Sequence, residues 1–190
     1  YCSRRQRQMC IRDSANIYGL ALAYKNNNNY ADGLKLLDDL INKYPKNLVI
    51  NTTKVDFLTH FGNYKEALLL ANKFLEISPK NYPLSISKSK ILLLMKKYFE
   101  SEEIIRDQLL RKNDDPELWL LLSEIQKTSQ NIIGYHQSRA EYYLLLGQNE
   151  MALNQLEFAL QLTQNNFQVS DRIMTKIIEI KKYLQDSRGL

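Results

Sequence analysis

The sequence is poor in cysteine, histidine and glycine, and each shortage excludes a class of site. Its two cysteines, Cys2 and Cys10, both lie in the first ten residues, so the rest of the chain can form neither a disulfide nor a thiolate metal site. The two histidines, His60 and His136, form no His-x-x-x-His pair, which excludes the helical zinc-protease motif from these residues. The six glycines are scattered and form no phosphate-binding loop, and no Gly-x-Ser-x-Gly elbow occurs. We therefore expect no catalytic, cofactor-binding or metal-binding residues here.

Long apolar runs are also missing. No run of eighteen apolar residues occurs, so we expect no membrane-spanning segment. Apolar residues make up 44% of the chain and charged residues 25%, which is typical of a protein that folds in water. The formal charge of +5 would suggest a nucleic-acid partner, but its distribution along the chain argues against one.

The first fourteen residues differ from everything that follows. They show no helical or strand period, and residues 4–14 (RRQRQMCIRDS) match the translation of the transposon-end adaptor used in sequencing libraries. We interpret residues 1–14 as a non-native segment, disordered or irregular, and exclude it from fold reasoning. The alternative is a disordered basic arm. The segment contributes +3 to the charge, leaving +2 for residues 15–190, which removes the main argument for nucleic acid. On this interpretation the chain is a fragment, and any signal peptide has been lost.

A sequence period runs through most of the chain. Tyr30, Tyr64 and Tyr98 are evenly spaced, and the same interval separates Pro45 from Pro79, each of which begins a Pro-Lys-Asn tripeptide. Apolar residues follow helical spacing on both sides of a turn within each period. The interval is that of the tetratricopeptide repeat (TPR), a helix–turn–helix unit of about 34 residues.

The period predicts an all-α fold, a TPR-like right-handed solenoid of about ten antiparallel helices in about five hairpins. Residues 15–185 form this solenoid, with three repeats over about 14–47, 48–81 and 82–115 and two irregular helix pairs over 116–146 and 149–185. The irregularity is inferred from Tyr135, which occupies the expected small-residue position, while Ala152 takes that role half a period later. Because half a period corresponds to one helix, we infer one extra helix over about 131–146.

A solenoid of helical hairpins exposes a surface lined by the first helix of each pair, which suits an extended peptide or a partner helix. Repeat register assigns nine candidate groove residues: Tyr18, Leu22, Thr52, Asp56, Thr59, His60, Ile86, Lys90 and Leu93. Tyr18, Thr52 and Asp56 stand where some TPR proteins carry the Lys, Asn and Arg that grip a C-terminal carboxylate. A co-chaperone role of that kind is therefore not expected.

Two stretches resemble a narrower family than the general repeat. They are HQSRAEYYLLLGQNEMALNQLEFAL, which begins at His136, and YGLALAYKNNNNYADGLKLLDDLINKYPKN, which begins at Tyr18. Both resemble the C-terminal TPR domain of the bacterial beta-barrel assembly-enhancing protease family, most specifically at residues 139–142 with Gly147 and Ala152. The resemblance implies a periplasmic protein whose zinc metallopeptidase domain, with its His-Glu-x-x-His motif and zinc ion, lies upstream of residue 15.

The resemblance also implies what this part of the chain would do. It would recruit the outer-membrane assembly machinery or a substrate, or contact the chain's own catalytic domain, within an enzyme of outer-membrane protein assembly and quality control. The alternative is a freestanding TPR adaptor or scaffold with no enzymatic activity. A third and weaker hypothesis, an RNA-binding helical array, is disfavoured by the charge of +2 that remains after residue 14.

Overall fold

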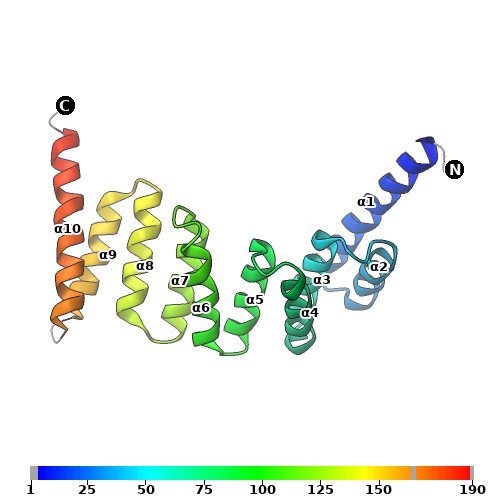
Figure 1. The fold of residues 1–190 in the computed structure, drawn as a ribbon, viewed down its shortest axis with the longest axis horizontal. Helices are drawn as coiled ribbons and strands as arrows, with labels where there is room; N and C mark the ends of the chain where they lie inside the picture. Colours follow the sequence, from blue (N-terminus) through cyan, green and yellow to red (C-terminus); the bar gives the residue numbers. More distant parts are fainter. Residues whose placement is uncertain (1–3, 164–165, 189–190) are drawn as a thin grey trace. The chain divides into compact units, whose positions relative to one another are not determined.

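The computed structural model describes residues 4–163 and 166–188, and within them the chain forms ten α-helices and no strand (Figure 1). The helices are α1 (Arg4–Asn26), α2 (Tyr30–Lys43), α3 (Leu48–His60), α4 (Tyr64–Ile77), α5 (Tyr82–Leu94), α6 (Tyr98–Leu109), α7 (Pro116–Thr128), α8 (Ile132–Leu145), α9 (Asn149–Gln161) and α10 (Phe167–Arg188). They divide into two compact units, unit 1 (residues 1–95, with α1–α5) and unit 2 (residues 96–190, with α6–α10). The all-α fold predicted from the period is confirmed for the described residues.

Unit 1 is built from two layers of helices. The first helices α1, α3 and α5 contact one another in sequence, and α2 and α4 contact the first helices on either side of them. Its core is formed by small residues and large ones that fit together, such as Ala67 and Ala71 of α4 against Val55, Leu58 and other apolar residues of the neighbouring helices. The small alanine side chains let helix backbones approach closely, which is what a stacked helical repeat requires.

In unit 2 each helix contacts its neighbours in sequence: α6 contacts α7, α7 contacts α8, α8 contacts α9, and α9 contacts α10. A core cluster joins α8, α9 and α10, and its members are Ala140, Ala152, Leu156, Ala159, Ile173, Ile177 and Ile180. A second set of contacts is polar: the buried Gln126 side chain of α7 donates to Glu102 Oε1 of α6 at 3.1 Å and accepts from Ser138 Oγ of α8 at 2.7 Å. This arrangement satisfies both ends of a buried amide, which would be costly to leave unpaired.

Three first helices begin at a side-chain cap that recurs once in every period. Asn47, Asn81 and Asp115 precede α3, α5 and α7, and each accepts a hydrogen bond from a backbone N–H group in the first turn of its helix. Such caps satisfy N–H groups that have no partner inside the helix. Asp115 also accepts a hydrogen bond at 2.9 Å from the ammonium of Lys112, and this bond together with the carboxylate charge raises the pKa of Lys112.

The turns after α1, α3, α5 and α7 share one backbone conformation even where the residue type changes. Asn28, Gly62, Lys96 and Gln130 follow one another at intervals of one period and have φ angles of +56°, +81°, +61° and +63°. Gly147, after α8, has a φ of +71°. A left-handed conformation costs most residues with a Cβ about 1–2 kcal/mol, and glycine and asparagine adopt it most readily. Lys96 and Gln130 therefore maintain the turn conformation without a residue type that favours it.

Two features differ from the expectations drawn from the sequence. We expected an irregular backbone for residues 1–14, but residues 4–14 form the first part of α1. Residues 1–3 lie outside the described residues. No proline or glycine interrupts residues 4–14, so nothing in them stops a helix from extending. The helix inferred over about 131–146 is α8, and its start at Ile132 lies one period after Tyr98, the start of α6. The period itself therefore predicts a second helix at this position, and α8 is not an extra helix.

Candidate functional site

All nine predicted groove residues belong to unit 1 and lie on its three first helices. Tyr18 and Leu22 lie on α1, Thr52, Asp56, Thr59 and His60 on α3, and Ile86, Lys90 and Leu93 on α5. Their spacing of three or four positions places each set along one side of its helix. Because α3 contacts both α1 and α5, the structure brings the three sets onto adjacent helices.

Two hydrogen bonds tie these helices together through groove residues or their neighbours. The Tyr18 hydroxyl lies 2.8 Å from Thr53 Oγ1, which links α1 to α3. Asp56 Oδ1 accepts a hydrogen bond from Ser87 Oγ at 2.7 Å, which links α3 to α5. Tyr18 and Asp56 therefore link the three helices, and both side chains also remain accessible to a partner at the surface.

The polar groove residues of α3 differ in what they present to solvent. Thr52 and Thr59 donate their hydroxyl groups to carbonyl oxygens one helical turn earlier in the same helix, so their methyl groups remain for contact with a partner. His60 ends α3 and is exposed, with Nε2 at 3.2 Å from Asn28 Oδ1 and its ring edge-on to Phe61 at 4.9 Å. His60 thus lies at the end of the surface, beside the turn between α1 and α2.

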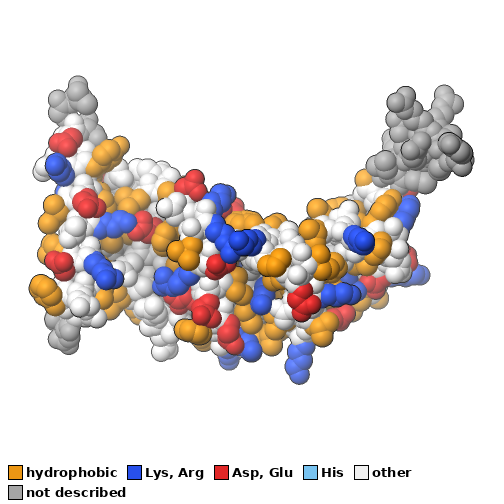
Figure 2. Space-filling view, viewed as in Figure 1, with side chains coloured by type: hydrophobic (Ala, Val, Ile, Leu, Met, Phe, Trp, Pro, Cys, Tyr) orange, Lys and Arg blue, Asp and Glu red, His pale blue; other side chains and the backbone are white. Residues whose placement is uncertain are grey.

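The remaining groove residues give the surface a mixed character. Leu22, Ile86 and Leu93 are half-buried, while Asp56 and Lys90 are exposed and carry one charge of each sign. Figure 2 shows Lys and Arg side chains intermingled with Asp and Glu on the face that it draws, without an area of a single sign. An apolar surface with one carboxylate and one ammonium suits a peptide better than a polyanion.

A hollow of about 320 Å³ opens beside Tyr18, between the α1 helix and the loop that leads into α3. Its lining includes Tyr18, Leu40, Tyr44 and Val49, and the Tyr44 hydroxyl lies 3.1 Å from Ser14 Oγ. Val49 is 64% exposed, so this hollow has an apolar side chain open to solvent at its edge. Sequence register did not identify Val49, because it lies near the start of α3 and outside the positions chosen for the groove.

Unit 2 contains an exposed aromatic group that sequence register also missed. The His136 ring of α8 lies close to the ring of Tyr135 on the same helix and to that of Phe158 on α9, and Phe158 is 51% exposed. The adjacent rings of Tyr142 and Tyr143 both contact Arg139. The only sequence signal that pointed here was the resemblance of the stretch that begins at His136.

The described residues contain no group of three or more His, Cys, Asp or Glu side chains arranged to hold a metal ion. His60 and His136 lie in different units. The resemblance assigns the zinc ion to an upstream domain, and the described residues provide no set of ligands to hold one. None of the helices in the described ranges is both long and apolar enough to cross a membrane.

Comparison with known proteins supports the repeat and the fold. Residues 58–125 match the family model described as tetratricopeptide repeat, and no curated protein matches the chain. MamA of Desulfovibrio magneticus RS-1 is similar in structure over 90% of this chain and 97% of its own, with a TM-score of 0.61 and 15% identity. PilF of Pseudomonas aeruginosa covers 91% of this chain and 82% of its own, with a TM-score of 0.62 and 13% identity.

A third similar structure belongs to a complex. A chain in the structure of Naa15/Naa10 bound to HypK-THB covers 93% of this chain and 35% of its own, with a TM-score of 0.55 and 19% identity. At these identities the three similarities concern the fold alone. The chain therefore has a tetratricopeptide-repeat-like all-α fold, and its residues 58–125 carry the sequence pattern of that repeat family.

Proposed function

We propose that this chain is a protein-interaction module that binds an extended peptide or a partner helix along α1, α3 and α5 of unit 1. The observation that carries the proposal is the set of nine predicted groove residues on three adjacent helices, where apolar side chains alternate with one carboxylate and one ammonium. Stacked helical hairpins present such a surface to protein partners. The similarity to a chain of the Naa15/Naa10 complex is consistent with a fold used in protein assembly.

A pull-down with the full chain tests this proposal. We expect the wild-type chain to capture factors of outer-membrane protein assembly from a bacterial envelope extract, and Ile86→Lys on α5 to abolish the capture. Leu69→Lys is the matched control, because Leu69 is 69% exposed on α4, the other layer of unit 1. Equal capture by the wild-type chain and the Ile86→Lys variant would contradict binding along these helices.

Our finer proposal concerns the parent protein. The stretches that begin at Tyr18 and His136 support a C-terminal module of a periplasmic zinc-dependent metalloprotease that acts in outer-membrane protein assembly and quality control. In that setting the zinc ion and the catalytic residues belong to an upstream domain, and the partner is the assembly machinery, a substrate or the catalytic domain itself. The upstream reading frame tests this proposal, because it should encode a His-Glu-x-x-His helix.

The second candidate is a freestanding TPR scaffold without an enzymatic domain. It is supported by the similarity to MamA, which extends over 97% of that chain. An upstream reading frame without a metallopeptidase motif would decide for this candidate and against the protease parent. The binding surface of unit 1 is common to both candidates.

A further inference from the structure

A second surface, on unit 2, combines aromatic rings with a cation. We call it the aromatic surface of unit 2 and define it by Tyr135, His136, Arg139, Tyr142 and Phe158. The first four are half-buried residues of α8, and Phe158 lies on the adjacent α9. Arg139 is the only Lys or Arg on these two helices, both of which lie wholly within the described residues.

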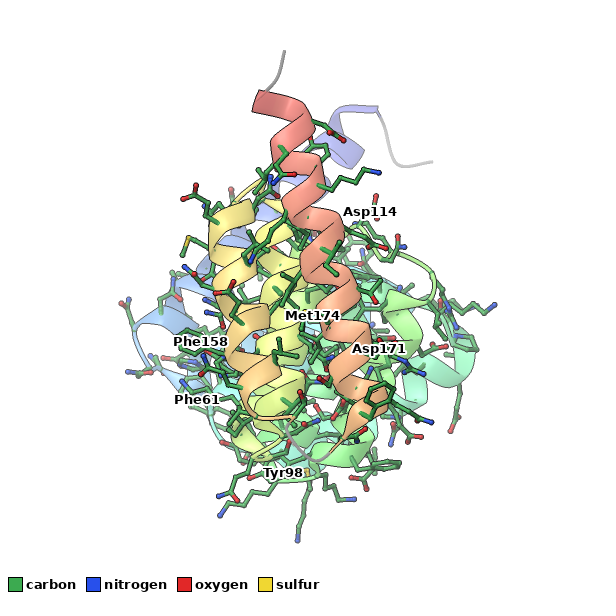
Figure 3. All side chains as sticks on the ribbon, turned by 90° about the vertical axis from the view of Figure 1, so that its left-hand side faces the viewer. Phe61, Tyr98, Asp114, Phe158, Asp171 and Met174 are labelled. Carbon is green, nitrogen blue, oxygen red and sulfur yellow. The ribbon has the colours of Figure 1, made fainter. Side chains whose placement is uncertain are left out.

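Three rings form one end of this surface. The His136 ring lies 4.9 Å from the Tyr135 ring and 5.6 Å from the Phe158 ring, measured between centroids. His136 Nδ1 lies 2.9 Å from Gln155 Oε1 of α9, which fixes the ring between the two helices. Phe158 is 51% exposed, and Figure 3 shows it on the side of α9 that is turned away from α10. In the described structure this ring cluster therefore exposes apolar surface to solvent.

Arg139 forms the other end. Its guanidinium carbon lies 5.2 Å from the centroid of the Tyr142 ring and 4.9 Å from that of Tyr143, and Nη2 donates to the Tyr143 hydroxyl at 2.7 Å. A guanidinium has five N–H donors in one plane, and this bond uses one of them. Two tyrosine rings thus hold the group in a fixed position while donors remain for a carboxylate.

The charges around this surface are unbalanced. Among the described residues, Arg139 and Lys127, whose ammonium lies 5.9 Å from the centroid of the Tyr135 ring, form no ion pair. The nearby carboxylates of Glu141 and Glu157 are already used, because each pairs with a lysine of α10. Within the described part of the chain, the aromatic surface therefore has cationic groups at both ends and no acidic partner of its own.

From these contacts we propose that the aromatic surface of unit 2 binds an acidic peptide segment that carries an aromatic or aliphatic side chain next to a carboxylate. The carboxylate pairs with the free donors of Arg139, and the apolar side chain lies against Phe158 and His136. A second acidic group reaches Lys127. This surface lies on unit 2, and the proposal stands independently of the groove proposed on unit 1.

Charge favours a peptide over single-stranded nucleic acid, which also uses aromatic and basic residues. Nucleic-acid binding draws its affinity from neutralising several phosphates in a row, and this surface offers two cations. A peptide with a few carboxylates can pair with two cations and needs no longer row of them. A nucleic-acid ligand is therefore one of the outcomes that the experiment must separate.

Fluorescence anisotropy with the full chain tests the proposal. The probe is a fluorescein-labelled peptide in which glutamates alternate with phenylalanine and leucine. The comparison probes are the same peptide with glutamine in place of glutamate, the same peptide with lysine, and a labelled oligouridine. We expect the acidic peptide to bind and the three comparison probes to bind at least about tenfold more weakly, as expected when a charge-assisted pair is lost.

Two pairs of variants assign the binding to this surface. Arg139→Gln should weaken binding of the acidic peptide at least about tenfold, whereas Arg172→Gln, which removes an exposed charge from α10, should leave it unchanged. Phe158→Ala should weaken binding as well, and Phe99→Ala, at a 74% exposed phenylalanine of α6, should not. Circular dichroism confirms that each variant is folded.

Three results would overturn the proposal. The first is equal binding of the acidic peptide by the wild-type chain and the Arg139→Gln variant. The second is tighter binding of oligouridine than of the acidic peptide. The third is no binding of the acidic peptide up to about 1 mM, the weak limit for a specific contact of this size.

Discussion

Replacing Gly62 with alanine should destabilise unit 1 for a reason that is purely conformational. Gly62 has a φ of +81°, and a Cβ built at this position has no heavy atom within 4 Å, so alanine meets no steric clash. Alanine in the left-handed region costs about 1–2 kcal/mol. The loss of freedom in the unfolded chain offsets about 0.4–1 kcal/mol of this cost. We expect Gly62→Ala to lower the free energy of unfolding by about 1 kcal/mol.

The matched control is Gly19→Ala, the same substitution within α1. A Cβ at Gly19 also has no heavy atom within 4 Å, but the backbone there is helical, so alanine should raise the free energy of unfolding by about 0.5–1 kcal/mol. Urea unfolding followed by circular dichroism measures both effects by linear extrapolation. A change of the same sign in the two variants would refute the conformational explanation of the turn.

Three further substitutions test contacts in the two units. Gly33→Ala should lower the free energy of unfolding by about 1–3 kcal/mol, because its Cβ would lie 2.6 Å from Phe57 Cζ. This loss should be smaller in a Phe57→Leu background, which a double-mutant cycle measures. Asp115→Ala should cost about 1 kcal/mol through the lost helix cap, whereas Asp115→Asn should keep most of the stability in thermal unfolding. Gln126→Leu should cost about 1–3 kcal/mol, because Ser138 Oγ loses its partner, and an unchanged urea midpoint would contradict a structural role for this amide.

The sequence predicted the helices well because their signal is periodic. The even spacing of Tyr30, Tyr64 and Tyr98 indicated the repeat period, and in the structure α2, α4 and α6 begin at these residues. The caps at Asn47 and Asn81 follow the same period. A repeated helical hairpin needs the same buried positions and the same turn each time, so its residues recur at fixed intervals.

Other features could not be predicted because residue type does not record them. Lys96 and Gln130 adopt the same left-handed turn conformation as Gly62, and neither residue type favours that conformation. The position of Phe158 against His136 depends on the contact between α8 and α9, which pairwise spacing in the sequence does not contain.

Site-specific photo-crosslinking tests the proposed protein-binding role most directly. A photoreactive amino acid is placed at Ile86, on the predicted binding side of α5, or at Leu69, on the exposed surface of α4, and the full chain is irradiated in a bacterial envelope extract. We expect crosslinks to a protein partner from position 86 and none from position 69. Crosslinks from position 69 alone would contradict binding along α1, α3 and α5.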